Sequence, residues 1–244
     1  AASSAPQRRG TALVLVNGES AEIGEELFRR GDFARVLLVG EGAGAHALDF
    51  ADARAAVGAA KALIARHPDI THVVDLVGLC ETPQDCDADP LGRMGFYQML
   101  IAACGDLTIL CVTQGLKPFS CEAPSLAGAK IAGLVKMLSA DYAHVDARVI
   151  DIDAAAYEEP GALGRILMRE MEAAPGPTEV CYRGGGRYLP ELSLSGLEGD
   201  EGAPFGVAED GVYVVSGGTN GVGLEIARIL ADKGARKIVL LGHT

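Results

Sequence analysis

Residues 212–223 read Val-Tyr-Val-Val-Ser-Gly-Gly-Thr-Asn-Gly-Val-Gly. A β-favouring run leads into a glycine-rich turn, and the residues that follow, from Leu224 to Arg228, begin an apolar pattern with helical spacing. Nucleotide-binding α/β proteins use such a strand–turn–helix unit to hold a pyrophosphate. The stretch therefore predicts an α/β fold with a phosphate-binding turn near its end.

The chain before this turn alternates between apolar β-like runs and helical patterns. We expect strands at 11–16, 35–39, 71–79, 107–112 and 147–152, and a β-like stretch at 179–189 that Gly184-Gly185-Gly186 interrupts. We expect helices at 19–30, 52–67, 86–104, 125–142 and 160–173. This alternation predicts a Rossmann-like parallel sheet with helices on both faces.

The regular pattern stops after residue 192. We expect residues 1–192 to form a first domain, and the Ser-, Gly- and acid-rich residues 193–210 to form a linker. Residues 211–244 restart the pattern with a strand at 212–215, a helix at 221–233 and a strand at 236–241. A two-stranded piece with one helix cannot bury both of its faces, so it must rest on the first domain or on further chain.

Composition excludes several classes of function. The 244 residues carry a net charge of -12 and a pI near 4.8, which argues against nucleic acid and anionic membranes as partners. The six cysteines form no C-x-x-C pair and no metal-ligand spacing, so we expect reduced thiols, no metal site and a cytoplasmic location. No signal peptide and no apolar run of about 20 residues is present. The chain lacks an initiating Met, which suggests a segment of something longer.

The first βα turn lacks the glycine spacing of a nucleotide site. Residues 16–26 there contain Glu19, Glu22, Glu25 and Glu26, and these carboxylates would repel a pyrophosphate. We therefore expect the first domain to be a scaffold without a cofactor. The glycines at 40, 42 and 44 are interpreted as a loop, with a ligand loop as the lesser alternative.

The motif Ser216-Gly217-x-x-x-Gly221-x-Gly223 is similar to the T-G-x-x-x-G-x-G fingerprint of short-chain dehydrogenase/reductases. Residues 213–241 resemble the start of the catalytic half of a polyketide synthase ketoreductase domain. The small-residue helix at 125–136, the strand ending in Asp151-Ile152-Asp153 and the segment 179–189 resemble its structural half. The resemblance covers essentially the whole chain and is strongest over 211–242.

This resemblance implies a cofactor-free, truncated Rossmann half packed against an NADPH-binding half. It implies reduction of a β-ketoacyl group on an acyl carrier protein, and contact with neighbouring synthase domains and with the rest of the catalytic half. The implied cofactor contacts are Ser216, Gly217, Gly218, Thr219, Asn220, Gly221, Val222 and Gly223. Asn220 stands where the family has Gly, and Asn tolerates a left-handed backbone. His243 stands where the family has an Arg for the 2′-phosphate; neutral His is a weaker partner, which leaves the preference for NADPH open.

No catalytic residue is assigned. The family's proton donor is a Tyr with Lys four positions later, and none of the six tyrosines here has one, so the resemblance places the catalytic group beyond residue 244. We interpret Lys130 and Lys136 as solvated and Cys111 as a core thiol. Three hypotheses follow: part of a ketoreductase that is inactive alone, a non-catalytic pseudo-ketoreductase scaffold, and, last, a free-standing nucleotide-binding protein.

Overall fold

The computed structural model describes residues 9–18, 20–21, 33–40, 44–79, 90–119, 124–154, 156, 161–193, 206–208 and 210–242. The chain divides into two compact units, Ala1–Glu191 and Leu192–Thr244, and each unit has its own β-sheet. The helix predicted over 19–30 lies almost entirely outside the described residues, as does part of the loop containing the glycines at 40, 42 and 44.

The first unit is built on a seven-stranded sheet with the order β2-β1-β3-β4-β5-β6-β7. Every neighbouring pair is parallel except β6 and β7. The order of the first five strands is doubly wound, with its change of direction between β1 and β3. The strands are β1 (Arg9–Val16), β2 (Phe33–Gly40), β3 (Ile70–Asp75), β4 (Leu107–Gln114), β5 (Val145–Ile152), β6 (Glu179–Arg183) and β7 (Gly186–Tyr188).

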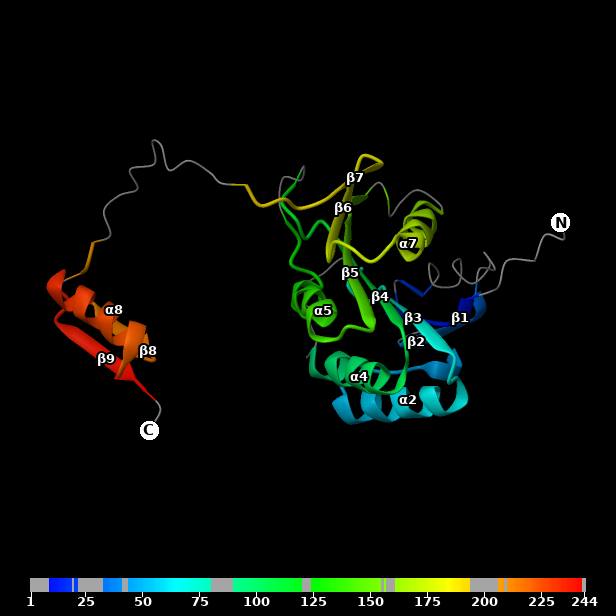
Figure 1. The fold of residues 1–244 in the computed structure, drawn as a ribbon, viewed down its shortest axis with the longest axis horizontal. Helices are drawn as coiled ribbons and strands as arrows, with labels where there is room; N and C mark the ends of the chain where they lie inside the picture. Colours follow the sequence, from blue (N-terminus) through cyan, green and yellow to red (C-terminus); the bar gives the residue numbers. More distant parts are fainter. Residues whose placement is uncertain are drawn as a thin grey trace. The chain divides into compact units, whose positions relative to one another are not determined.

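Helices cover both faces of this sheet, as predicted (Figure 1). One face packs against α2 (Ala53–Arg66), α4 (Pro90–Ala103) and α5 (Ala129–Asp141), and the other against α7 (Ala162–Glu172). Alternate residues of β1 are buried in the two cores: Leu13 and Leu15 in the first, Val14 and Val16 in the second. Burial on both faces explains why the strands read as continuous apolar runs.

The expectation of a parallel sheet is corrected at its edge. Cys181 pairs with Tyr188, and Arg183 with Gly186, in antiparallel register. The two residues between the strands, Gly184 and Gly185, have φ of 53° and 77°. A two-residue hairpin turn of type I′ needs positive φ at both central positions, which glycine supplies without steric cost. The glycines that interrupt the predicted β-like stretch therefore reverse the chain and create an antiparallel edge strand.

The second unit is a parallel pair, β8 (Val212–Ser216) and β9 (Lys237–Leu241), joined by α8 (Gly221–Asp232). Its core is small, with Val215, Ala227 and Leu230 buried. Large apolar side chains on its strands and helix are exposed: Val212, Val214, Val222, Ile226, Ile229, Val239, Leu240 and Leu241. These surfaces require further packing partners for a stable domain.

Among the described residues, no helix has the length and apolar character that crossing a membrane requires.

Candidate dinucleotide-binding site

The predicted phosphate-binding turn joins β8 to α8. Gly217 and Gly221 have φ of 72° and 54°, a left-handed conformation that a side chain would disfavour. Asn220, by contrast, has φ of −155° and ψ of 175°, which is extended backbone open to any residue. The tolerance of Asn for the left-handed region is therefore not what accommodates it. The strained positions of this turn are both occupied by glycine.

Gly223 brings the helix close to the turn. A Cβ atom at Gly223 would lie 2.2 Å from the carbonyl oxygen of Gly217 and 3.0 Å from the Cα of Gly218. Only glycine fits this backbone approach, because any side chain would push α8 away from the strand end. The amide of Gly218 also donates to the carbonyl of Leu241 at 3.0 Å, which ties the turn to β9.

The N-terminus of α8 is electropositive, and neither a side-chain cap nor an acidic residue of the first turn offsets this charge. Asn220 occupies the N-cap position without a side-chain cap hydrogen bond, and the first turn contains no acidic residue. The first intrahelical bond to the cap runs from the amide of Leu224 to the carbonyl of Asn220. Amides that precede it in the helix have no intrahelical acceptor, and together with the helix dipole they favour an anion.

Most side chains of the turn before this helix lie at the surface. Ser216, Thr219, Asn220 and Val222 are exposed at the surface of the turn, whereas Gly218 is buried. A Cβ at Gly242, just after β9, would lie 2.2 Å from the Oγ1 of Thr219, so the chain after β9 approaches the turn closely. The eight predicted turn residues, 216–223, thus lie together, while His243 falls outside the described residues.

The corresponding turn of the first unit is occupied by its own side chains. Asn17, directly after β1, donates from Nδ2 to the carbonyls of Val77 and Leu79 at 3.2 and 3.1 Å. Its Oδ1 accepts from the amide of Ser20, whose Oγ accepts from the amide of Asn17. These bonds bridge the ends of β1 and β3, which is where a doubly wound sheet binds its ligands. The Asn17 side chain thus ties the ends of β1 and β3 to each other at this position.

The first unit contains three buried charge clusters that sequence reasoning did not identify. In the first, Asp75 accepts hydrogen bonds from Tyr97 at 2.6 Å and from Arg93 at 3.3 Å. Burial raises the pKa of Tyr97 well above its ordinary value, and the neighbouring Asp75 carboxylate raises it further. Burial likewise raises the pKa of Cys111, the predicted core thiol, so this buried thiol stays protonated.

The other two clusters are centred on Asp151, at the end of β5, and on Glu170, in α7. Asp151 accepts from Arg183 at 2.6 Å and from Thr113 at 2.7 Å, and its oxygens also accept from the amides of residues 116 and 117. Glu170 of α7 accepts from Arg148 at 2.7 Å and from Tyr182 and Arg187 at 2.6 Å. All three acidic side chains are essentially fully buried, so their role is to fix the scaffold rather than to meet a substrate.

No group of three or more metal-ligating side chains occurs in the described part of the chain. The interpretation of Lys136 as a solvated side chain is corrected, because its ammonium pairs with Glu179 at 2.7 Å. Cys111 is buried, as expected.

Residues 211–244 match the family model described as the KR domain. The chain is 34% identical over 184 residues to polyketide synthase PksL of Bacillus subtilis, which covers 72% of this chain and 4% of the relative. It is 32% identical over 131 residues to a phenolphthiocerol/phthiocerol polyketide synthase of Mycobacterium tuberculosis, covering 53% of this chain and 7% of that protein. The chain therefore spans less than a tenth of the length of these relatives.

Solved ketoreductase structures share the fold. A C2-type ketoreductase from a modular polyketide synthase superposes with a TM-score of 0.60 at 19% identity, covering 97% of this chain and 52% of that structure. The first ketoreductase of the tylosin polyketide synthase gives a TM-score of 0.61 at 18% identity, covering 96% and 49%. In sequence and fold, the chain resembles ketoreductase-like domains of polyketide synthases.

Proposed function

We propose that this ketoreductase-like segment is the part of a polyketide synthase β-ketoacyl reductase that holds NADPH by its pyrophosphate. The observation that carries the proposal is the uncapped start of α8, which lies behind the glycines at 217, 221 and 223. Domains of this type generally bind NAD(P)H. In the first unit, the equivalent position is bridged by Asn17, so the second unit is the one suited to a cofactor.

The residues of the turn would each contribute to binding. Amides at the start of α8 donate to the phosphates, and the exposed hydroxyls of Ser216 and Thr219 lie within the same turn. Gly223 keeps the helix close enough for this approach. When bound, NADPH would supply a hydride to the β-keto carbon of an acyl chain carried on an acyl carrier protein. The proton donor, a Tyr in this family, would come from further chain, so we expect residues 1–244 alone to be inactive.

Nucleotide binding is tested by titrating NADPH into this chain and into a version extended by about 150 residues, the length that completes a domain of this class. Gly223→Ala should weaken binding at least about tenfold, because the added methyl collides with the backbone of the turn. Gly133→Ala is the matched control: it lies in helix α5 and its Cβ would meet nothing within 4 Å. Absence of NADPH binding by both wild-type versions would refute the proposal.

The second part of the proposal is a preference for NADPH over NADH, and it depends on His243. Replacing it with Arg introduces a permanent charge and a bidentate donor for a 2′-phosphate. His243→Arg in the extended chain should raise the affinity for NADPH about tenfold relative to NADH. An unchanged ratio of the two affinities would mean that residue 243 does not approach the 2′-phosphate.

The alternative is a non-catalytic ketoreductase scaffold that supports neighbouring synthase domains. It is favoured by the substitution of His243 for the family Arg and by the large scaffold unit, whose charge clusters are buried and structural. The two functions are separated by assaying the extended chain with NADPH and a β-ketoacyl thioester, both free and attached to an acyl carrier protein. Reduction eliminates the scaffold function, and faster reduction of the carrier-bound thioester supports the carrier protein as partner.

A further inference from the structure

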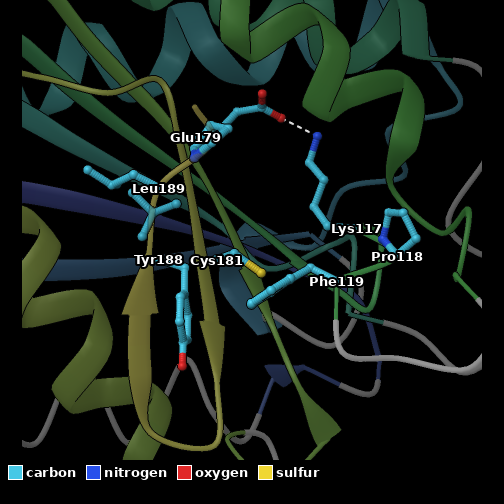
Figure 2. Close-up of a pocket in the computed structure, with 9 residues that line it drawn as sticks. Lys117, Pro118, Phe119, Glu179, Cys181, Tyr188 and Leu189 are labelled. Carbon is cyan, nitrogen blue, oxygen red and sulfur yellow. Dashed lines mark ion pairs between the residues drawn. The ribbon is translucent and has the colours of Figure 1, made fainter. Parts of the chain in front are cut away.

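The two edges of the seven-stranded sheet differ in length and in protection. The edge strand β7 is three residues long, and Pro190 follows it closely. The ring centroids of Tyr188 and Phe119 lie 4.9 Å apart beside it (Figure 2). Short edge strands and nearby prolines keep other strands from pairing with the edge of a sheet. The β7 edge is therefore poorly suited to the addition of a further strand.

The opposite edge strand, β2, has none of these devices. It is eight residues long, contains no proline and keeps an unshifted register with β1. Within the described residues, no strand pairs with its outer side. Alternate residues of an edge strand turn their amides and carbonyls away from the sheet, where they can pair with another strand. The carbonyl of Gly40 accepts from the amide of Leu48 at 3.2 Å, so the open edge runs from Phe33 to Val39.

The side chains of β2 suit an apolar partner strand. Leu37 packs against the core on one face of the sheet, and Val36 and Leu38 pack against the core on the other face. All three side chains are only half-buried. Apolar side chains on an added strand would cover them further from both faces.

The only charged residue of β2 is Arg35, and it is exposed. Its guanidinium donates to Nδ1 of His67 at 2.8 Å. Partial burial, and then the charge of Arg35, lower the pKa of His67, so this ring is neutral at pH 7 and supplies no counter-charge. No carboxylate in the described part of the chain forms an ion pair with Arg35. An acidic side chain opposite Arg35 on an added strand would supply that charge.

We propose that the outer edge of β2 pairs with an extended apolar segment of a partner protein that carries an acidic side chain opposite Arg35. Backbone hydrogen bonds along β2 provide the affinity, and the charge of Arg35 selects the acid. Antiparallel pairing is favoured, because it is slightly more stable than parallel pairing. The surface includes no residue of the glycine turn, so it stands whether or not the chain binds NADPH.

The test adds the synthetic peptide Thr-Val-Thr-Val-Glu-Val-Thr to the whole chain. When this peptide is antiparallel to β2 and its first residue is opposite Val39, its Glu is opposite Arg35. The peptide should cause a saturable slowing of hydrogen exchange at alternate amides of residues 35–39, because only the amides that face away from β1 gain a new partner. The amides of β7 should exchange at an unchanged rate.

A second peptide with Lys in place of Glu should bind roughly two- to fivefold more weakly, the range for an exposed charge pair. Arg35→Glu should reverse this preference. Arg54→Glu is the matched control, since it makes the same charge change at the exposed start of α2, and it should leave the preference unchanged.

The proposal is overturned if neither peptide slows exchange in β2, or if Arg35→Glu does not reverse the preference between the two peptides. It is also overturned if the same amides of β2 become protected without peptide as the concentration of the chain rises. That result would mean that a second copy of the chain covers this edge.

Discussion

Replacing Glu170 with Gln tests how the scaffold unit is held together. The carboxylate of Glu170 is fully buried and accepts hydrogen bonds from Tyr182 and Arg187 at 2.6 Å and from Arg148 at 2.7 Å. Arg148, itself fully buried, also donates to the carbonyls of residues 170, 174 and 177. This one acid therefore joins β5, α7 and the β6–β7 hairpin.

The magnitude follows from the pKa of Glu170. Burial alone would raise it, but hydrogen bonds from Arg187, Tyr182 and Arg148 outweigh burial and lower it from 4.5 to about 2. A carboxyl whose pKa is lower in the folded state contributes stability above its unfolded pKa and loses it as the pH falls through the folded pKa. A difference of 4.5 − 2 = 2.5 corresponds to at most about 3 kcal/mol of unfolding free energy.

We expect Glu170→Gln to lower the unfolding free energy at pH 7 by about 3 kcal/mol, because the buried Arg148 loses its close 2.7 Å ion pair and keeps only the longer one to Asp146 at 3.6 Å. Below pH 4.5 the two proteins should converge, as the wild type loses this contribution between pH 4.5 and 2. Urea unfolding of the whole chain, followed by near-ultraviolet circular dichroism across this pH range, measures both effects. Amide hydrogen exchange in β5 and α7 shows whether the loss of stability and its dependence on pH belong to the first unit.

Glu225, which pairs with Arg228 across an exposed helix surface, provides the control acid. Glu225→Gln should change the unfolding free energy at pH 7 by less than about 1 kcal/mol. A difference between Glu170→Gln and wild type that stays constant from pH 7 to pH 2 would refute the reasoning, because it would mean that ionisation of Glu170 does not support the fold.

Three further changes have defined outcomes. Asn17→Ala should lower the unfolding free energy by about 1–3 kcal/mol, since the carbonyls of Val77 and Leu79 lose their donors; urea unfolding measures it, and an unchanged value would contradict the bridge. Gly133→Ala should raise the melting temperature by adding about 0.5–1 kcal/mol, since its Cβ meets open space within α5, and a lower melting temperature would contradict this. Arg228→Ala should change stability by less than about 1 kcal/mol in the same thermal assay, because its ion pair is more than half exposed; a larger loss would show that the pair does more than the geometry indicates.

The fold and the turn were largely predictable because their signals are local. The apolar runs of β1 and β4 and the breaks between them predicted a sheet with helices on both faces, and the structure confirms this. The residues of 216–223 are contiguous, so their joint placement follows from one strand–turn–helix unit. Even there, the extended backbone of Asn220 did not follow from the sequence, because it depends on how α8 begins.

The hydrogen bonds of Asn17 and the buried ion pairs of the first unit were not predictable from sequence. Asn17 and Val77 are sixty residues apart, and Arg183 lies 32 positions after Asp151, with which it pairs. No spacing rule connects such positions. Their proximity results from the strand order, which places β1 beside β3 and β5 beside β6.

The sequence by itself determined the order of strands and helices and the glycine turn at Ser216–Gly223, because backbone sterics and apolar periodicity act over a few neighbouring residues. Only the tertiary structure decided that the chain reverses at Gly184 and Gly185 to form an antiparallel edge strand. It also decided that Asn17 bridges the ends of β1 and β3. The same holds for Glu170, which accepts hydrogen bonds from Arg148, Arg187 and Tyr182. These features depend on which strands become neighbours, and that is set by packing of the whole sheet rather than by any local stretch.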